Sequence, residues 1–214
     1  MPHISTTDEL EIIESGGGTK PPSASGGDDD SPSGRSGIPQ RVYVTGITIG
    51  MAAILMFFMA FVSAFIVRKG LGSDWRVFPL PRILWLDTLI LLASSVTIVR
   101  ARHFFARGDR ESFRHWWTVT TILGFLFLAG QLIAWRQMVI SGFYLATSAS
   151  SSFFYVLTAA HGLHLLGGIV ALLYVGRGKL HRLTSATATE IASLYWHFMD
   201  GLWVFLFLLL WLGR

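Results

Sequence analysis

The sequence contains no cysteine and has few charged residues for its length. The absence of cysteine excludes disulfide bonds, thiolate metal sites and cysteine-based catalysis within this chain. Only 14% of the 214 residues are charged, whereas soluble domains carry about a quarter. The extreme N-terminus also lacks a basic segment followed by an apolar one, so we expect no secretory signal peptide. The shortage of charge indicates an integral membrane protein.

The first 41 residues have a different composition from the rest of the chain. The stretch GGGTKPPSASGGDDDSPSGRSG is rich in Gly, Ser, Pro and Asp and contains no aromatic residue. Such a segment cannot bury enough apolar surface to offset the entropy of ordering it. We therefore predict a disordered tail over residues 1–41. The preceding DELEIIES has the alternative of forming a short helical turn on a partner, and the purpose of this acidic tail stays open.

Long apolar runs fill the remainder, residues 42–214. Each run is close to the length that crosses a hydrocarbon core of about 30 Å at about 1.5 Å per residue. The runs are continuous rather than alternating, which excludes barrel strands. We predict an all-α integral membrane bundle of five transmembrane helices, with the second extending into RARHFF. The predicted spans are Tyr43–Val67, Ile83–Val99, Trp116–Trp135, Phe153–Val175 and Ile191–Leu212.

Basic residues are distributed unequally between the two ends of the spans. The positive side of a membrane protein faces the cytoplasm. With five spans, ten basic residues share the side of the N-terminus: Arg35, Arg41, Arg100, Arg102, Arg107, Arg110, Arg114, Arg177, Lys179 and Arg182. Among those on the other side are Arg68, Lys69, Arg76, Arg82 and Arg214. We therefore predict a cytoplasmic N-terminus and an external C-terminus. The short loops containing these residues explain the basic net charge without a nucleic-acid partner.

Ionisable residues inside the spans concentrate in the last two. His161 and His164 lie within the fourth span, and Glu190, His197 and Asp200 follow one face of the fifth. Polar groups are costly in lipid unless they face protein, water or a cofactor. If the two polar faces meet, the carboxylates accept hydrogen bonds from the imidazoles, which lowers the burial cost of both. The sequence thus predicts a structural polar network, with no catalytic, cofactor-binding or metal-binding residue.

Other interpretations of these histidines remain open. His164 and His197 come out at similar depth, which would suit the two axial ligands of a haem-b electron carrier. His161 and His164, three residues apart, would suit zinc if a third ligand were nearby. A proton-carrying transporter is a further alternative, although no internal repeat or Gly/Pro-interrupted span supports it. For Asp87 we expect a loop or helix-dipole contact, and for Gln131 a bond between helices.

Four motifs resemble subunit III of the haem–copper oxidases. The fourth span, FYVLTAAHGLHLLGGIVALL, is similar to the hallmark helix of that family, and EIASLYWHFMDGLWVFLFLLLW is similar to its last helix. LWLDTLILLASSVTI and LGFLFLAGQLIAW resemble two further helices. The resemblance covers residues 42–212 in order, and five spans are typical of the short bacterial form.

This resemblance implies a role without redox chemistry in the chain itself. It implies a subunit of a terminal oxidase in the bacterial inner membrane, where a complex reduces oxygen to water and pumps protons. Haem and copper would lie in the partner catalytic subunit I, with subunit II as a further partner. The chain would stabilise subunit I and hold phospholipids in a cleft that Phe57, Phe58 and Phe61 would line. The electron donor, quinol or cytochrome c, is left open.

One position departs from the family pattern. The family usually carries a buried Glu shortly before a Met-Phe-Phe triplet, which is Met56-Phe57-Phe58 here, and the aligned residue is Ile54. That Glu is associated with oxygen entry and proton uptake, so a direct proton role for this helix is in doubt. The departure leaves a second possibility, an accessory subunit of a nitric oxide reductase.

Overall fold

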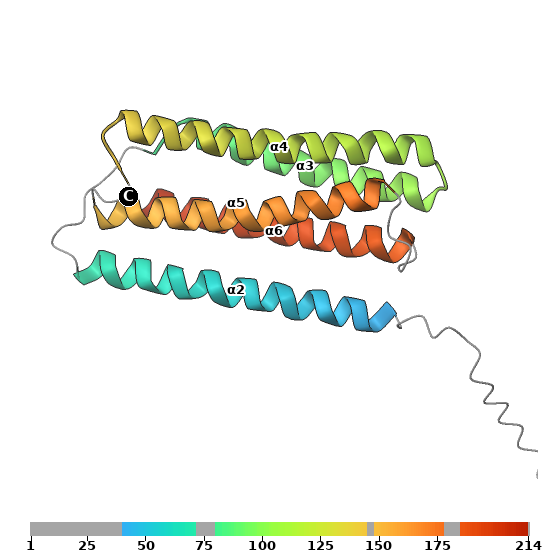
Figure 1. The fold of residues 1–214 in the computed structure, drawn as a ribbon, viewed down its shortest axis with the longest axis horizontal. Helices are drawn as coiled ribbons and strands as arrows, with labels where there is room; N and C mark the ends of the chain where they lie inside the picture. Colours follow the sequence, from blue (N-terminus) through green and yellow to red (C-terminus); the bar gives the residue numbers. More distant parts are fainter. Residues whose placement is uncertain (1–39, 72–79, 145–147, 178–184, 214) are drawn as a thin grey trace, which may run out of the picture. The chain divides into compact units, whose positions relative to one another are not determined.

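All five predicted spans are α-helices in the computed structural model, which describes residues 40–71, 80–144, 148–177 and 185–213 (Figure 1). The helices are α2 (Gln40–Leu71), α3 (Ile83–Ala106), α4 (Arg110–Ile140), α5 (Ala149–Gly176) and α6 (Ser185–Gly213). Each of the five is long and apolar enough to cross a membrane, and no strand occurs in these ranges. The all-α prediction is confirmed, whereas the predicted tail and its helical turn lie outside the described residues.

Polar caps mark the starts of α4 and α5, both of which begin before their apolar runs. Asp109 precedes α4 and its carboxylate accepts a hydrogen bond from the Ser112 N–H at 3.0 Å. Ser148 precedes α5 and forms a capping box with Ser151. Such caps satisfy backbone N–H groups that have no partner within the helix, so a helix can begin before its apolar segment. The turn between α3 and α4 contains Gly108 at φ 78°, a conformation that favours glycine.

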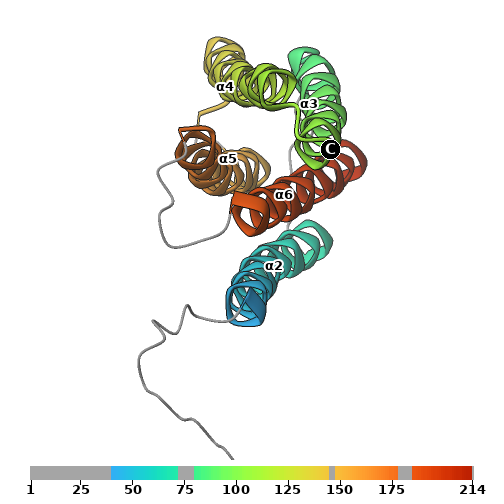
Figure 2. The same ribbon diagram turned by 90° about the vertical axis from the view of Figure 1, so that its right-hand side faces the viewer.

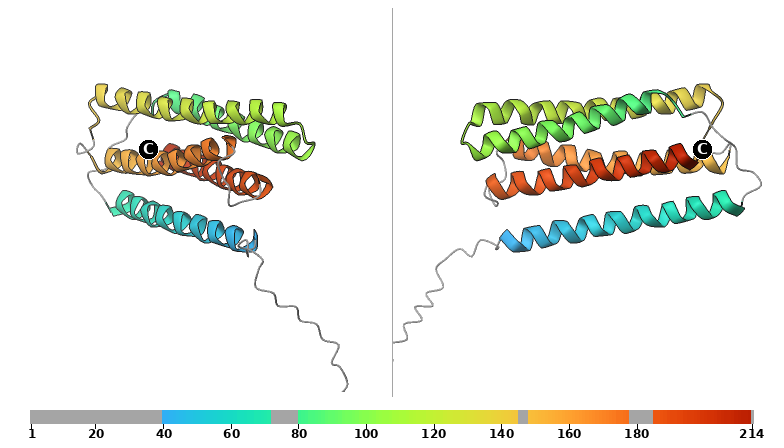
Figure 3. Two further views of the ribbon diagram at one scale, coloured as in Figure 1. Left: turned by 45° about the vertical axis from the view of Figure 1, so that its right-hand side comes forward. Right: turned by 180° about the vertical axis from the view of Figure 1, so that it is seen from behind.

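Helices α3, α4, α5 and α6 form a four-helix bundle in which neighbours in sequence pack side by side and α6 closes on α3 (Figure 2). Within the described part of the chain, α2 packs only on α5 and α6, on the opposite side from α3 and α4 (Figure 3). Helix α2 therefore packs beside α6, although the two helices lie at opposite ends of the described sequence.

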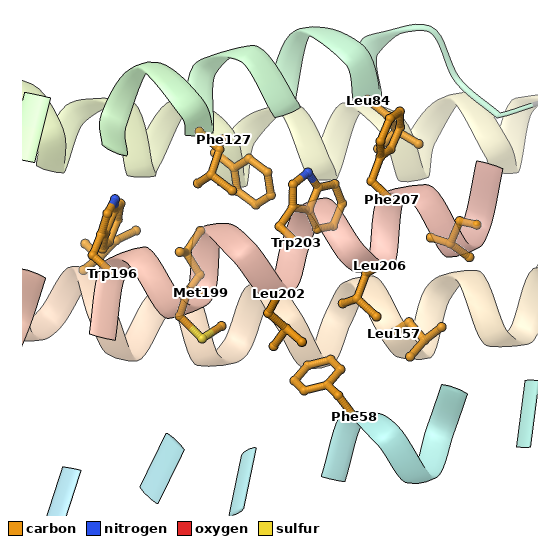
Figure 4. Packing of buried hydrophobic residues seen from close by; sticks show 14 of the residues in the cluster. Phe58, Leu84, Phe127, Leu157, Trp196, Met199, Leu202, Trp203, Leu206 and Phe207 are labelled. Carbon is orange, nitrogen blue, oxygen red and sulfur yellow. The ribbon is translucent and has the colours of Figure 1, made fainter. Parts of the chain in front are cut away.

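Large aromatic side chains fill the centre of the bundle. Trp196 and Trp203 project from α6 towards α3 and α4, and Trp203 contacts Phe127 of α4 at 4.9 Å between ring centroids (Figure 4). Gly124 permits close packing here, since a Cβ on it would lie 2.7 Å from the Trp196 indole. The close packing of α4 against α6 therefore depends on a residue without a side chain.

Helix α2 contacts the bundle through a short row of side chains. Phe58, Val62 and Phe65 are buried against α5 and α6. At its end, the Lys69 amine donates to the carbonyl of Leu212 at 3.3 Å. A Cβ on Gly213 would collide with the Phe65 ring, so this end of α2 also lies close to the end of α6.

Candidate functional site

Three side-chain hydrogen bonds join α6 to α3 at two levels in the middle of the bundle. The pairs are Trp203 Nε1 to Thr88 Oγ1 at 3.1 Å, Trp196 Nε1 to Ser94 Oγ at 3.0 Å, and Ser95 Oγ with His197 Nδ1 at 2.7 Å. An indole N–H buried in an apolar environment needs an acceptor, and a hydroxyl on the facing helix supplies it. We refer to these six residues as the α3–α6 polar seam.

Asp200 lies within the seam but forms none of its hydrogen bonds. Its side chain is 4% exposed, and both carboxyl oxygens lack a hydrogen-bond partner among the described residues. The hydroxyl of Ser193, two turns earlier on α6, is also buried without a partner in that part of the chain. Asp200 is therefore the most costly polar group in the membrane-spanning region.

The two histidines of α5 occupy different surroundings. His161 is fully buried against Phe127 and Trp203, with ring centroids 5.8 and 5.0 Å away, and neither ring nitrogen has a hydrogen-bond partner within the described ranges. His164 is partly buried, and its Nδ1 donates to the carbonyl of Ala160 at 2.7 Å. Its ring packs against Phe58 of α2 at 5.6 Å. One histidine thus belongs to the bundle core and the other to the contact with α2.

The five residues of the predicted network do not share hydrogen bonds in the described structure. His197 bonds to α3, His164 bonds to its own helix, and Glu190 is exposed. A hydrogen bond between α5 and α6 is instead made by Tyr195, whose hydroxyl donates to the carbonyl of His164 at 2.9 Å. The polar face of α6 thus meets α3 rather than the histidines of α5.

A second buried pair joins α3 to α4. The Gln131 side-chain amide donates to Asp87 Oδ2 at 3.0 Å, which confirms the predicted role of Gln131 between helices. Asp87 is 1% exposed, so the expected loop or dipole contact is wrong; the carboxylate points into the bundle. Gly130 makes room for it, because a Cβ at that position would collide with the carboxyl group. The Asp87–Gln131 hydrogen bond and the absence of a side chain at Gly130 together set the spacing of α3 and α4.

Potential metal ligands are dispersed. In the described ranges, no three side chains of His, Cys, Asp or Glu lie close enough together to hold one metal ion. The rings of Phe127 and Trp203 both pack against His161 and against each other. Several of the buried polar groups form hydrogen bonds between helices, as between Trp196 and Ser94 and between Gln131 and Asp87.

The three phenylalanines predicted to line a lipid cleft cluster on α2. Phe57 is exposed and contacts Phe58 and Phe61 edge to face, at 5.4 and 4.9 Å. Phe58 is fully buried in the core. An apolar cavity of about 320 Å³ does lie between α2, α5 and α6, and its lining includes Ile47, Gly167 and Tyr195 rather than these phenylalanines.

Several features of this site escaped the sequence-based prediction. Hydroxyl groups of α3 and the two tryptophans of α6 form most of the seam. These side chains carry no charge, so a search for ionisable residues within the spans does not find them. The available signal was the position of Trp196 and Trp203, which lie near mid-span rather than at a membrane boundary, where tryptophan is usual. A mid-span indole predicts a polar partner on a neighbouring helix.

Comparisons with known proteins agree with this architecture. Residues 36–213 match the family described as cytochrome c oxidase subunit III. A probable cytochrome c oxidase subunit 3 of Mycobacterium tuberculosis is 34% identical over 176 residues, covering 79% of this chain and 87% of that protein. A probable subunit 3 of Nocardia farcinica is 34% identical over 187 residues, covering 80% and 92%. That of Bacillus sp. PS3 is 30% identical over 174 residues, covering 80% and 82%. With this match across its whole membrane domain, the chain belongs to the cytochrome c oxidase subunit III family.

Proposed function

We propose that the chain stabilises the catalytic subunit of a terminal haem–copper oxidase without carrying a redox centre. Family membership makes it an accessory subunit of a terminal oxidase. The oxidase would reduce oxygen to water and pump protons, with haem and copper in subunit I. The observation that carries this proposal is the α3–α6 polar seam, in which three polar side chains of α6 form hydrogen bonds with α3. These hydrogen bonds hold α3 and α6 at one relative position, which gives a rigid surface on which a larger partner can pack.

The surface of α2 supports an association with further membrane components. Most of its apolar side chains are exposed, including Ile49, Met56 and Ile66. We propose that this surface contacts phospholipids and the neighbouring subunits I and II. The cavity between α2, α5 and α6 is apolar, which suits an acyl chain.

The proposed orientation follows from the charge distribution. The beginning of α4 and the end of α5 lie at the same end of the bundle as the turn after α3. Arg107, Arg110, Arg114 and Arg177 all belong to this end. An excess of arginine in short loops favours the cytoplasmic side. We place the N-terminus there and the C-terminus outside, in the bacterial inner membrane.

Leucine substitutions in α6 test the stabilising role. His197→Leu removes a seam hydrogen bond, and Asp200→Leu replaces an unpartnered buried carboxyl group. We expect both variants to change the yield of the assembled oxidase, His197→Leu lowering it, while the haem absorption spectrum of whatever assembles is unaltered. His103→Leu, at an exposed position near the end of α3, is the matched control. An altered haem spectrum in assembled His197→Leu would refute the structural role.

Ile54 supports a second candidate function. It is partly buried and packs against the core, in the place where the family usually has an acidic residue. A subunit without that carboxyl group also suits a nitric oxide reductase. Purifying the complex through a tag on this chain and comparing its turnover of oxygen and nitric oxide decides between the two. Oxygen turnover alone excludes the reductase.

A further inference from the structure

A groove of about 350 Å³ runs along the bundle between the first half of α4 and the last turns of α5. Its walls are mainly apolar, with Trp117, Ile122 and Phe125 on one side and Leu172 and Leu173 on the other. The groove is separate from α2 and from the cavity beside it. It therefore belongs to no site discussed above.

The floor of the groove is closely packed. The Trp117 indole donates to the carbonyl of Leu172 at 2.8 Å, which ties α4 to α5. Gly176 lies against the same indole, and a Cβ there would be 3.0 Å from it. The helices are thus held at one separation along the groove, and its shape does not depend on an exposed loop.

Two arginines stand at the head of the groove. Arg114 projects from α4 and Arg177 follows the end of α5, and both line the groove. Both are exposed, and in the described structure neither side chain has a hydrogen bond or ion pair. Arg100 at the same end differs, because its guanidinium lies 5.0 Å from the centre of the Trp116 ring. The groove therefore offers two uncommitted cations directly above an apolar channel.

The surroundings of the arginines favour an anion. The hollow beside Arg114 is lined by Arg110, His115 and one acidic residue, Glu111. Basic pockets between helices on the cytoplasmic side bind anionic lipid headgroups, and each arginine near the surface contributes to such binding. From Arg114 to Phe125 the helix rises about 16 Å, close to the depth of one leaflet of a bilayer whose core is about 30 Å thick. The length suits one acyl chain.

We propose that this groove binds one anionic phospholipid, with its phosphate between Arg114 and Arg177 and one acyl chain along Trp117, Ile122 and Phe125. Guanidinium groups recognise phosphate oxygens through paired hydrogen bonds. The proposal goes beyond the accessory role in the oxidase, and it requires only that the chain spans a membrane. Its failure would leave the proposed oxidase function untouched, because it is tested on this chain alone.

The test is native mass spectrometry of the purified full chain titrated with phosphatidylglycerol or phosphatidylcholine. We expect the first phosphatidylglycerol to bind at least tenfold more tightly than phosphatidylcholine. The double variant Arg114→Gln/Arg177→Gln should weaken phosphatidylglycerol binding about thirtyfold. Arg102→Gln/Arg107→Gln removes the same charge at the same end, outside the groove, and should bind as the unaltered chain does.

A third variant separates the groove from charge alone. Thr118→Trp fills the exposed part of the groove and leaves both arginines in place. We expect it to lose most of the high-affinity binding, with helical content in the far-ultraviolet circular dichroism spectrum unchanged. Equal loss in the two arginine pairs would show a general charge effect and overturn the site. Unchanged binding in Thr118→Trp, or in Arg114→Gln/Arg177→Gln, would overturn it as well.

Discussion

Helix α2 and the bundle of α3–α6 are held by different interactions. In its most apolar stretch α2 has 17% of its residues buried, whereas α6 has 50%. The bundle contains buried hydrogen bonds between side chains of different helices, whereas α2 meets it through the rings of Phe58 and Phe65 and, near its end, a hydrogen bond from Lys69 to the Leu212 carbonyl. Within lipid, apolar contact gives little advantage over the surrounding acyl chains, so packing shape and polar bonds decide association.

The difference shows how register is set in the two regions. A hydrogen bond such as Trp196 Nε1 to Ser94 exists only at one relative position of two helices, and a slip of one turn leaves both groups unpaired. Ring contacts such as that of Phe58 on α2 with His164 on α5 lose less free energy when the helices slide. The bundle is thus a defined scaffold, and α2 is attached to it by a contact that tolerates adjustment.

The largest expected effect comes from filling the gap at Gly130 in the bundle. A Cβ there collides with the Asp87 carboxyl group and displaces it from Gln131, so we expect Gly130→Ala to lower the free energy of unfolding by about 3 kcal/mol. Reversible unfolding in mixed micelles, followed by circular dichroism, measures this. Gly167→Ala is the control, since nothing lies within 4 Å of its Cβ.

A double variant identifies the cause. Asp87→Ala combined with Gly130→Ala removes the colliding group, so the combined loss should be smaller than the sum of the two single losses. Strict additivity would show that Asp87 is not what Gly130 accommodates. The Asp87–Gln131 pair would then not be what sets the spacing of α3 and α4.

A smaller effect is expected where α2 meets the bundle. Phe58→Ala leaves a cavity against α5 and α6, which we expect to cost about 2 kcal/mol, less than in a soluble core because lipid is itself apolar. Because the chain has no cysteine, replacing Val44 and Tyr174 with cysteine directs spin labels to these two positions and to no others. The distance distribution between them should broaden in Phe58→Ala.

The exposed Phe205 provides the matched control for α2. Phe205→Ala removes a ring of the same size from the lipid-facing side of α6, so the distribution should stay narrow. A distribution in Phe58→Ala as narrow as in the control would mean that α2 is held by something other than its aromatic row.

Loss of one hydrogen bond of the seam should lower the free energy of unfolding by a still smaller amount. Ser95→Ala removes the partner of His197 Nδ1, at an expected cost of about 0.6 kcal/mol, typical of bonds between membrane helices. A double-mutant cycle with His197→Gln isolates this coupling in the same unfolding assay. Ser141→Ala, whose hydroxyl bonds only to its own helix, controls for loss of a hydroxyl. Zero coupling would count against the seam.

The smallest effect concerns pH at the start of α4. Hydrogen bonds from the hydroxyl and then the backbone N–H of Ser112 hold the pKa of Asp109 below its ordinary value of 3.8. A lowered pKa stabilises the folded helix above pH 3.8, and this contribution is lost as the pH falls through the lower, folded-state value. Helix α2 has no acidic residue in its first turn and should show no such change.

Nuclear magnetic resonance of the Ser112 amide measures this capping effect. We expect its chemical shift to titrate below pH 3.8 in the unaltered chain. Asp109→Asn keeps an oxygen acceptor at the cap but cannot titrate, so its Ser112 shift should be flat over the same range. A titration that persists in Asp109→Asn would assign the effect to another group.

Hydropathy was sufficient to predict the spans because a lipid core demands continuous apolar segments. All five predicted runs fall inside the observed helices, and α3 extends to Ala106 as predicted. The starts of α4 and α5 were missed because Asp109 and Ser148 act through local capping, which hydropathy does not measure. Family membership was also predictable, since the motifs around His161 and His197 are specific.

The partners of the polar side chains were not predictable in the same way. Helical periodicity shows that His197 and Asp200 share a face of α6, but it does not show which helix that face meets. Adjacency in sequence suggested α5, whereas packing turns the face towards α3, where Ser95 lies. Helices α3 and α5 are both apolar and both contact α6, so only the three-dimensional structure shows which of them the polar face of α6 meets.

The position of α2 has a consequence for how the protein is made. Among the described helices, α2 packs only on α5 and α6, and its Lys69 amine bonds to the Leu212 carbonyl near the end of α6. During synthesis α2 therefore enters the bilayer before the helices that it contacts, and it stays without them until α5 and α6 have been inserted. Closure of α2 onto α5 and α6 is thus expected to be the final step of biogenesis, and a chain truncated before α6 should leave it unattached.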